Sequence, residues 1–262
     1  GLRALLKALD VNKGFIGIEA NKPEALKNVT EAAKPYPEIE VVGMQVKYPE
    51  GAEKQLIYAC TGREVPSGAL PIAVGAVVSN VATAAAISNA IREGMPLVER
   101  ITTVTGPCIK EPKNLITKVG TKFSEIIEQC GGIKEGVTAS KLIAGGPMMG
   151  LAQYTSDIST NKGSSGILIL PEEMAVAPEQ MNCIKCGRCT DVCPAFLQPL
   201  FISAYSLKNN FDEAEKHRAM DCIECGSCSY ICPARRLLLP SIRQAKREIG
   251  AKRRKAQAAQ KK

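Results

Sequence analysis

The stretch Cys183-Ile-Lys-Cys-Gly-Arg-Cys-Thr-Asp-Val-Cys-Pro194 decides the fold of the last third of this chain. It is repeated 39 residues later, with the same cysteine spacing, as Cys222-Ile-Glu-Cys-Gly-Ser-Cys-Ser-Tyr-Ile-Cys-Pro233. Cysteines two residues apart place three thiolates on one tight loop, in which a glycine eases the turn. Such a loop suits three corners of an iron–sulfur cube.

The fourth cysteine of each run stands before a proline, at the start of the adjoining helix. In proteins with the bacterial ferredoxin ligand run, this cysteine binds the other of two [4Fe-4S] clusters. One predicted site therefore takes three cysteines of the first run and the fourth of the second: Cys183, Cys186, Cys189 and Cys232. The other site takes the remaining four: Cys193, Cys222, Cys225 and Cys228. The crossed pattern would hold two clusters close enough for electron hopping.

Zinc and disulfides are the alternatives for these eight cysteines. Zinc ribbons use paired Cys-x2-Cys motifs but need neither a third cysteine two residues on nor a fourth before proline. A disulfide scaffold would not produce this duplication, and the chain opens without a secretory signal, so we expect a reducing compartment. The remaining cysteines, Cys60, Cys108 and Cys130, are expected to be small buried hydrophobic residues.

The segment 195–220 between the two runs has apolar residues at helical spacing and predicts a helix pair that shields the clusters. The only histidine, His217, lies there among charged residues, and we expect it to be solvated on the surface.

The net charge of +8 is concentrated in residues 234–262, which hold eleven Lys or Arg against one acid, Glu248. This tail predicts a basic helix that is solvated or faces anionic lipid. Nucleic acid is disfavoured because no aromatic residue follows Tyr230.

Residues 1–98 predict an α/β domain with a partial Rossmann-like layer. A leucine-rich helix ends just before Gly14 and leads into an apolar strand at 15–18. A second helix starts at Pro23 with Asn21 as a candidate N-cap, and a strand at 39–46 is expected to pair in parallel with the first. Helices at 53–59 and 80–92 flank a Gly/Pro-rich loop at 62–71. Because a helix leads directly into the sheet and no initiator Met is present, we expect part of the domain upstream.

Residues 99–170 predict a small β-grasp-like domain. It has strands at 100–104 and 167–170, a helix at 123–130 closed by two glycines, and a turn-rich loop at 144–150. A linker at 171–179 opens the ferredoxin-type domain, 171–240, which is followed by the basic tail, 241–262. No apolar run approaches the roughly 18 residues that a membrane-spanning helix needs.

Several longer motifs accompany the cysteine runs: residues 47–66, with the sequence KYPEGAEKQLIYACTGREVP, and also VSNVAT at 78–83, VTGP at 104–107 and GGPMMG at 145–150. With these motifs, essentially the whole chain resembles the C subunits of the Rnf complex. Those complexes are membrane-associated NADH–ferredoxin oxidoreductases that couple electron flow to ion translocation. The chain is similar, more distantly, to the flavin subunit of respiratory complex I.

The resemblance implies an FMN/NADH-binding α/β domain, a soluble-ligand-binding β-grasp (SLBB) module and two [4Fe-4S] clusters, with NADH as substrate. It also implies a peripheral protein on the cytoplasmic face of the inner (cell) membrane. Its expected partners are other subunits of a membrane redox complex, ferredoxin and NAD(H). The expected function is to pass electrons between NADH/FMN and ferredoxin or membrane partners.

In the complex I flavin subunit, a Gly-Glu-Glu-Thr and an Asn-Val-x-Thr segment line the flavin pocket. The resemblance places the first at 51–54, with Ala52 and Lys54 departing from the pattern, and the second at 80–83. The residues implied to bind the cofactor are Gly51, Glu53, Lys54, Asn80 and Thr83. On spacing alone, Asn80 is a helix N-cap. The family's glycine-rich flavin loop lies upstream of the first residue, so the flavin site is expected to be incomplete here.

Two alternative functions share parts of this pattern. A cobalamin reductase of the propanediol-utilisation type has the same flavin, β-grasp and two-cluster parts. A simple ferredoxin-like relay would carry electrons without a substrate of its own.

Overall fold

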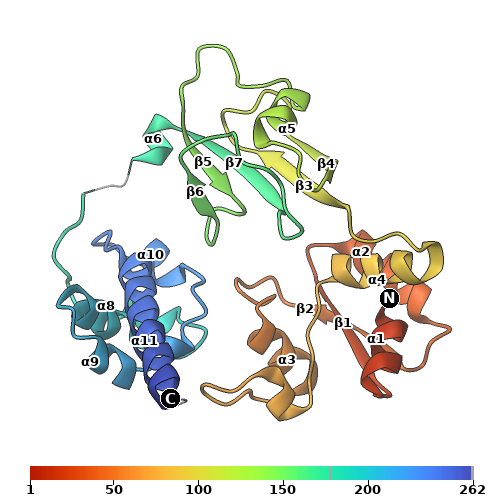
Figure 1. Cartoon of the computed structure of the whole chain (residues 1–262), viewed down its shortest axis with the longest axis horizontal. Helices are drawn as coiled ribbons and strands as arrows, with labels where there is room; N and C mark the ends of the chain where they lie inside the picture. The colour runs from red at the N-terminus through yellow and green to blue at the C-terminus, as the bar shows by residue number, and fades with distance from the viewer. Residues whose placement is uncertain (177–178, 261–262) are drawn as a thin grey trace. The chain divides into compact units, whose positions relative to one another are not determined.

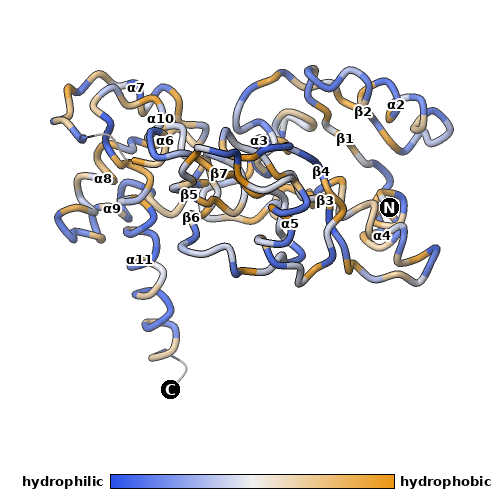
Figure 2. The backbone as a smooth tube through the Cα atoms, turned by 90° about the horizontal axis from the view of Figure 1, so that it is seen from above, coloured by the Kyte–Doolittle hydropathy of each residue, from blue (hydrophilic) through white to orange (hydrophobic). Residues whose placement is uncertain are grey.

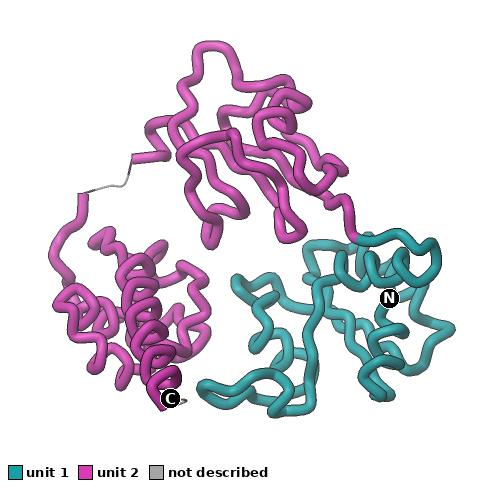
Figure 3. Tube along the Cα trace, viewed as in Figure 1, with its two compact units in different colours: residues 1–96 teal, residues 97–262 magenta. Residues whose placement is uncertain are grey.

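The computed structural model describes residues 1–176 and 179–260 (Figure 1). The chain divides into two compact units, Gly1–Pro96 and Leu97–Lys262, which Figure 3 shows in teal and magenta. This division lies close to the predicted limit between residues 98 and 99. The predicted domain limits themselves remain predictions.

The first unit opens with a helix, α1, and a strand–helix–strand segment. These elements are α1 (Leu2–Leu9), β1 (Gly14–Glu19), α2 (Pro23–Ala33) and β2 (Ile39–Met44). β1 and β2 pair in parallel, with Gly14 opposite Ile39 and Glu19 opposite Met44. The parallel pairing predicted from the short apolar first strand is therefore confirmed.

The ends of two helices in this unit differ from the sequence prediction. α1 is capped by Asp10, which adopts a left-handed φ of 51°, whereas Gly14 already belongs to β1. α2 has Lys22, not Asn21, at its N-cap, without a side-chain hydrogen bond. The turn after β1 explains this, because the backbone N–H of Lys22 donates to the carbonyl of Glu19. Pro23 then starts α2 in the first-turn position that its fixed φ favours.

The rest of the first unit contains two longer helices and a short 3-10 helix. These are α3 (Glu53–Thr61), η1 (Pro71–Val74) and α4 (Val81–Glu93). Asn80 caps α4, since its side chain accepts a hydrogen bond of 2.9 Å from the backbone N–H of Ala82. Gly94, with a φ of 67°, follows the last turn.

The second unit begins with a five-stranded sheet and one helix. The elements are β3 (Glu99–Thr105), β4 (Lys113–Lys118), α5 (Phe123–Gln129), β5 (Ala139–Ala144), β6 (Leu151–Gln153) and β7 (Gly166–Pro171). The strand order is β4-β3-β7-β5-β6. β3 and β7 run in parallel and the other neighbours are antiparallel. The sequence predicted β3, α5 and β7 but not β4, β5 and β6.

The core of this β-grasp-like domain lies between α5 and the sheet. Its buried residues are Val104, Cys108, Ile109, Phe123, Ile126, Ile127, Cys130, Ile167 and Ile169. Cys108 and Cys130 are fully buried, as predicted, whereas Cys60 of the first unit is only half-buried. Burial raises the pKa of the Cys108 and Cys130 thiols, which favours their neutral form.

The predicted linker at 171–179 is shorter in the structure. Pro171 ends β7, and α6 (Glu172–Ala175) follows it directly. Residues 177 and 178, which the prediction placed in the same linker, lie outside the described residues.

The cysteine runs lie in a helical domain. Its elements are α7 (Arg188–Asp191), α8 (Pro199–Leu207), α9 (Phe211–Lys216), η2 (Ala219–Asp221), α10 (Ser227–Ile231) and α11 (Leu238–Gln260). The predicted helix pair between the runs corresponds to α8 and α9. The core joins α8, α9 and α11 through Leu197, Ile202, Ala214, Ala219, Cys228, Leu238, Ile242, Ala245 and Ile249. Cys189, Cys193 and Cys222 pack against this core.

The basic tail is the second half of α11. All buried residues of this helix fall at or before Ile249. Beyond that point the helix runs past α8 and α9 and is largely hydrophilic (Figure 2). The predicted start of the tail at 241 therefore falls within a continuous helix, and residues 261 and 262 lie outside the described residues. Among the described residues, none of the helices combines the length and apolarity needed to span a bilayer.

The prediction for His217 is wrong. Its ring stacks on Phe201 and Tyr205 of α8, with centroid distances of 5.6 and 5.1 Å, and the residue is half-buried. His217 is the C-cap of α9, and this position turns its ring back onto α8. The charged neighbours in the sequence form ion pairs of their own, such as Lys216–Glu213, and gave no sign of this contact.

Candidate iron–sulfur centres

The two cysteine runs adopt the same backbone conformation. Gly187 and Gly226 have φ values of 79° and 85° and stand directly before α7 and α10. Two residues earlier, Lys185 and Glu224 also adopt positive φ, at 55° and 58°. Glycine is favoured where φ is positive because it has no Cβ to clash. Each loop therefore turns at two residues only two positions apart, which brings its first three cysteines into the wall of one cavity.

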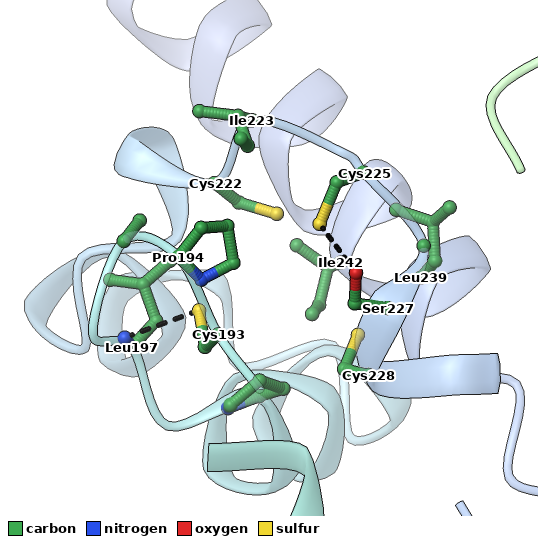
Figure 4. Close-up of a pocket in the computed structure, with 13 residues that line it drawn as sticks. Cys193, Pro194, Leu197, Cys222, Ile223, Cys225, Ser227, Cys228, Leu239 and Ile242 are labelled. Carbon is green, nitrogen blue, oxygen red and sulfur yellow. Dashed lines mark hydrogen bonds between the residues drawn. The ribbon is translucent and has the colours of Figure 1, made fainter. Parts of the chain in front are cut away.

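Four cysteines surround one cavity, which we call site II. They are Cys193, Cys222, Cys225 and Cys228. Their sulfur atoms face one another across the cavity (Figure 4). The rest of its lining is mostly apolar and includes Pro194, Leu239 and Ile242.

A second cavity, site I, has the other four cysteines in its wall. They are Cys183, Cys186, Cys189 and Cys232. In both sites, three cysteines come from one run and the fourth from the other run. The structure thus brings together the two sets of four that the sequence predicted to share a cluster. Their role as iron ligands remains a prediction.

Backbone amides and a hydroxyl lie against four of the sulfur atoms. In site I the N–H of Lys185 donates to Cys183 Sγ over 3.3 Å. In site II the N–H groups of Leu197 and Glu224 donate to Cys193 and Cys222 over 3.3 and 3.4 Å. Cys225 Sγ lies 3.5 Å from Ser227 Oγ, which Figure 4 marks as a dashed line. In the Cys225–Ser227 contact the thiol is the donor, whereas the three backbone N–H donors would stabilise thiolates and tune the potential of a cluster that these thiolates bind.

The two sites differ in burial. In site II, Cys225 and Cys228 are only 7% and 8% exposed, whereas Cys183 and Cys186 of site I are exposed. Burial, with the nearby Cys222 and Cys225 adding to the effect, raises the pKa of the Cys228 thiol to about 12. A thiolate at this position therefore needs a bound cation to compensate for its loss of hydration.

An ion-paired cluster fastens the site II loop to α11. Glu224 accepts from Arg243 over 2.9 Å and from Lys246 over 2.7 Å. Lys246 also donates to the carbonyl of Cys222 over 2.6 Å. Burial alone would raise the pKa of Glu224, but the hydrogen bonds and charges of Lys246 and Arg243 outweigh it and lower the pKa.

Sequence reasoning missed this cluster, although the repeat carried a signal for it. Shifted by 39 residues, the positions of Glu224, Arg243 and Lys246 become Lys185, Ala204 and Leu207 in the first half. The acid and both of its bases are therefore confined to the second half of the repeat.

The residues of both sites fit a four-iron cluster. Such a cluster presents four separate iron corners to four thiolates, and each cavity offers four cysteines around a central space. Their sulfurs do not converge on a single point. Among the described residues, no group of three or more His, Cys, Asp or Glu is placed to hold one metal ion.

The residues implied to bind flavin lie at the starts of two helices. Gly51 precedes α3, and Glu53 and Lys54 occupy its first turn. Asn80 caps α4 and Thr83 lies in the first turn of that helix. All are exposed except the half-buried Lys54, whose amine donates to the carbonyl of Pro66 over 3.3 Å.

These residues do not enclose a flavin. No hydrogen bond or ion pair joins the α3 group to the α4 group among the described residues, and the space beside Gly51 is open for at least 4 Å. The side-chain oxygen of Asn80 is already used by the cap. The flavin-binding role of all five residues remains a prediction, and we derive no chemical step from it.

Three family models match successive parts of the chain. Residues 1–89 match the Nuo51 FMN-binding domain, 101–152 the SLBB domain and 176–233 the 4Fe-4S dicluster domain. The predicted fold class is confirmed by this order of domains. Together with the two cysteine sites, it defines a multidomain iron–sulfur protein of the class that joins a complex I-type FMN domain to a ferredoxin-type domain.

Sequence relatives identify the family within this class. The chain is 52% identical, over 97% of its length, to the C subunit of the Na(+)-translocating ferredoxin:NAD(+) oxidoreductase complex from Acetobacterium woodii. It is 49% identical, over 82% of its length, to the C subunit of the proton-translocating complex from Clostridium ljungdahlii. The chain belongs to this family of C subunits of ion-translocating oxidoreductase complexes, as the Rnf resemblance predicted.

The relatives are longer than this chain. It covers 57% of the Acetobacterium woodii protein, 47% of the Clostridium ljungdahlii protein and 41% of a 40% identical relative from Rhodobacter capsulatus. A solved NAD+-reducing [NiFe]-hydrogenase aligns with 92% of this chain and 50% of its own chain, at a TM-score of 0.57. At 14% identity, this likeness shows a shared fold alone.

Proposed function

We propose that this chain is the part of an electron-transfer subunit that holds two [4Fe-4S] clusters in a membrane-associated, ion-translocating oxidoreductase. The observation that carries the proposal is the grouping of eight cysteines into two cavities with crossed fourth members. When bound, such clusters accept and release one electron at a time. Family membership supports this function over the cobalamin reductase alternative.

The chain's own residues would hold the clusters and shield them. Cys183, Cys186, Cys189 and Cys232 would bind one cluster, and Cys193, Cys222, Cys225 and Cys228 the other. Leu239 and Ile242 of α11 line site II and would shield a cluster there from water. The backbone donors at Cys183, Cys193 and Cys222 would stabilise the additional negative charge of a reduced cluster.

An anaerobic redox titration tests this proposal. The protein is reconstituted with iron and sulfide, freed of unbound metal and titrated with dithionite. We expect the uptake of about two electrons per chain, one per cluster. Uptake of no electrons by a chain that retains its folded structure would refute the electron-transfer function.

For the whole subunit we propose FMN as a further cofactor and NADH as the substrate on the flavin side. The match of residues 1–89 to an FMN-binding domain supports this assignment. Adding FMN and then NADH to this chain distinguishes a flavin-dependent enzyme from a plain relay. Bleaching of bound flavin would show a working flavin site in this chain. If no flavin is bleached, this chain functions as a relay without its own flavin site. The exposure of the candidate flavin residues of α3 and α4 favours this result.

The proposed partners are the other subunits of the complex and ferredoxin, and the proposed location is the cytoplasmic face of the inner (cell) membrane. The names of the relatives, which specify ferredoxin and NAD(+) as reactants, support these partners. Copurification with membrane subunits of such a complex is the direct test.

A further inference from the structure

The repeat allows the surroundings of the two sites to be compared position by position. Ile223 and Glu224 of the site II loop are half-buried, and Glu224 is ion-paired to α11. Their counterparts in the site I loop, Ile184 and Lys185, are exposed. α8 is the counterpart of the first part of α11, but it has Ala204 and Leu207 at the positions of Arg243 and Lys246, so no comparable ion pair covers the site I loop among the described residues. Site I is therefore the open end of the two-site unit.

Apolar side chains gather around this open end. Met181, Ile184 and Leu237 are 55%, 67% and 45% exposed. Ile184 lines site I itself. Met181 and Leu237 lie on neighbouring segments, because the N–H of Met181 donates to the carbonyl of Ala234 over 3.0 Å and that of Leu237 to Gln180 Oε1 over 3.2 Å. An isolated exposed apolar residue needs no explanation, but three around a redox site form a candidate contact.

Positive charges surround this apolar centre. Lys185 and Arg236 line site I, and Arg188 and Arg235 are exposed neighbours in the same two segments. None of the four forms an ion pair within the part of the chain that the structure describes. Segments 181–190 and 233–237 contain no acid, and the acids that flank the first segment in the sequence are Glu179 and Asp191. An apolar centre with a predominantly positive rim is the arrangement expected for transient electrostatic docking.

We propose that this surface, the site I face, docks a redox protein that presents clustered carboxylates around its own redox centre. The site I face consists of Met181, Ile184, Lys185, Arg188, Arg235, Arg236 and Leu237. The proposal rests on the proposed function, since it takes site I as the place where electrons enter or leave. Interfaces of electron-transfer complexes are small and short-lived, which agrees with a surface of seven residues. The opposite rim charge would speed association and orient the partner over Cys183 and Cys186.

Binding of an acidic two-cluster ferredoxin to the cluster-loaded chain tests the proposal. Affinity and association rate are measured anaerobically by interferometry at about 20 and about 200 mM salt. We expect binding to weaken about tenfold or more with salt. The triple variant Lys185→Gln, Arg188→Gln, Arg235→Gln should bind about tenfold more weakly, mainly through slower association. Ile184→Ser should weaken binding mainly through faster dissociation.

A matched control removes three exposed charges of α11 that lie outside the site I face, by Arg247→Gln, Arg254→Gln and Lys255→Gln. This variant has the same net charge as the first and should bind within about twofold of the parent. Equal losses in both triple variants would overturn the proposal, because only net charge would then matter. Unchanged ferredoxin binding by the site I variants would also overturn it.

Two further readouts separate the other outcomes. Iron and sulfide content and reduction by dithionite are measured in every variant. Clusters absent from the parent would refute the proposed function, whereas clusters present with unaltered binding would refute only the docking surface. Vesicles with anionic phosphatidylserine test for a lipid surface. If the site I variants lose vesicle binding but keep ferredoxin binding, the site I face is a lipid contact and the proposal fails.

Discussion

At the scale of single residues, the two halves of the cysteine repeat share a backbone but differ in the residues that surround it. The glycines at 187 and 226 and the positive φ at 185 and 224 are common to both. Only the second half has an acid at the third position, and this acid is fixed by Arg243 and Lys246. The residue at this position therefore distinguishes the two loops. The loop with Lys185 is open to solvent, and the loop with Glu224 is held against α11.

Replacing Glu224 by Gln should destabilise the ferredoxin-type domain by about 1–2 kcal/mol. The change leaves two half-buried bases without their carboxylate, and hydrogen bonds to charged groups contribute in this range. The apparent melting temperature of the cluster-loaded protein, at a fixed scan rate, measures the effect. Lys185→Gln at the equivalent exposed position should change it little. An equal effect of both substitutions would contradict the role assigned to the ion pairs.

The crossed grouping of cysteines makes a prediction for Cys232. Although it belongs to the second run, Cys232→Ser should perturb the same cluster as Cys183→Ser, because both residues line site I. Electron paramagnetic resonance of the reduced variants measures which cluster signal changes. Cys222→Ser should alter the other signal. If Cys232→Ser matched Cys222→Ser instead, each run would bind its own cluster.

At the scale of helices and strands, α11 has two parts with different roles. Its buried side chains end at Ile249, which is 1% exposed, and the residues beyond form exposed ion pairs such as Lys252–Asp212. Deletion of residues 251–262 should therefore cost less than about 1 kcal/mol. Ile249→Ala should cost about 2–4 kcal/mol through lost burial and a cavity. Denaturant unfolding of the two variants under identical conditions measures the difference, and a larger cost for the deletion would contradict this division.

The β-grasp-like domain should lose stability at alkaline pH. Burial raises the pKa of Cys108 and Cys130 in the folded state. The folded state therefore keeps their protons when the unfolded chain, with a usual pKa of about 8.5, begins to lose them. The resulting stability is fully present below about pH 8.5 and declines as the pH rises toward the folded pKa. Thermal melts at a series of pH values measure how the stability decreases as the pH rises. The parent should show this decrease, and a Cys108→Ala, Cys130→Ala variant should lack it.

Sequence patterns predicted some elements of the fold well and others not at all. The cysteine spacing was sufficient to predict which cysteines lie together, and the short apolar strand at 15–18 to predict a parallel strand pair. Each of these patterns is compatible with few other structures. β4 escaped prediction because its buried residue is Thr117, a polar side chain paired with Thr102 through a 2.7 Å hydroxyl contact. β6 has only three residues, and β5 buries only Ile143. The stacking of His217 depends on where α8 and α9 meet, which local sequence does not specify.

At the scale of the whole molecule, the net charge of the protein should depend on whether the two clusters are bound. The chain alone carries a formal charge of +8. Each oxidised cluster with four thiolates contributes about −2, so loading both should lower the net charge by about four. Anaerobic capillary electrophoresis before and after chelation of iron measures this change. Dithionite should lower the charge further by about two, whereas bound zinc would give no such step.

The proposed electron transfer by this chain requires that the eight cysteines of the two runs hold two four-iron clusters. The most direct test is iron, zinc and acid-labile sulfide analysis of the anaerobically purified chain, with spectra of the dithionite-reduced protein. We predict about eight iron and eight sulfide per chain and the signals of two reduced [4Fe-4S] clusters. Zinc in place of iron, or cystines between the runs with no sulfide, would contradict this assignment.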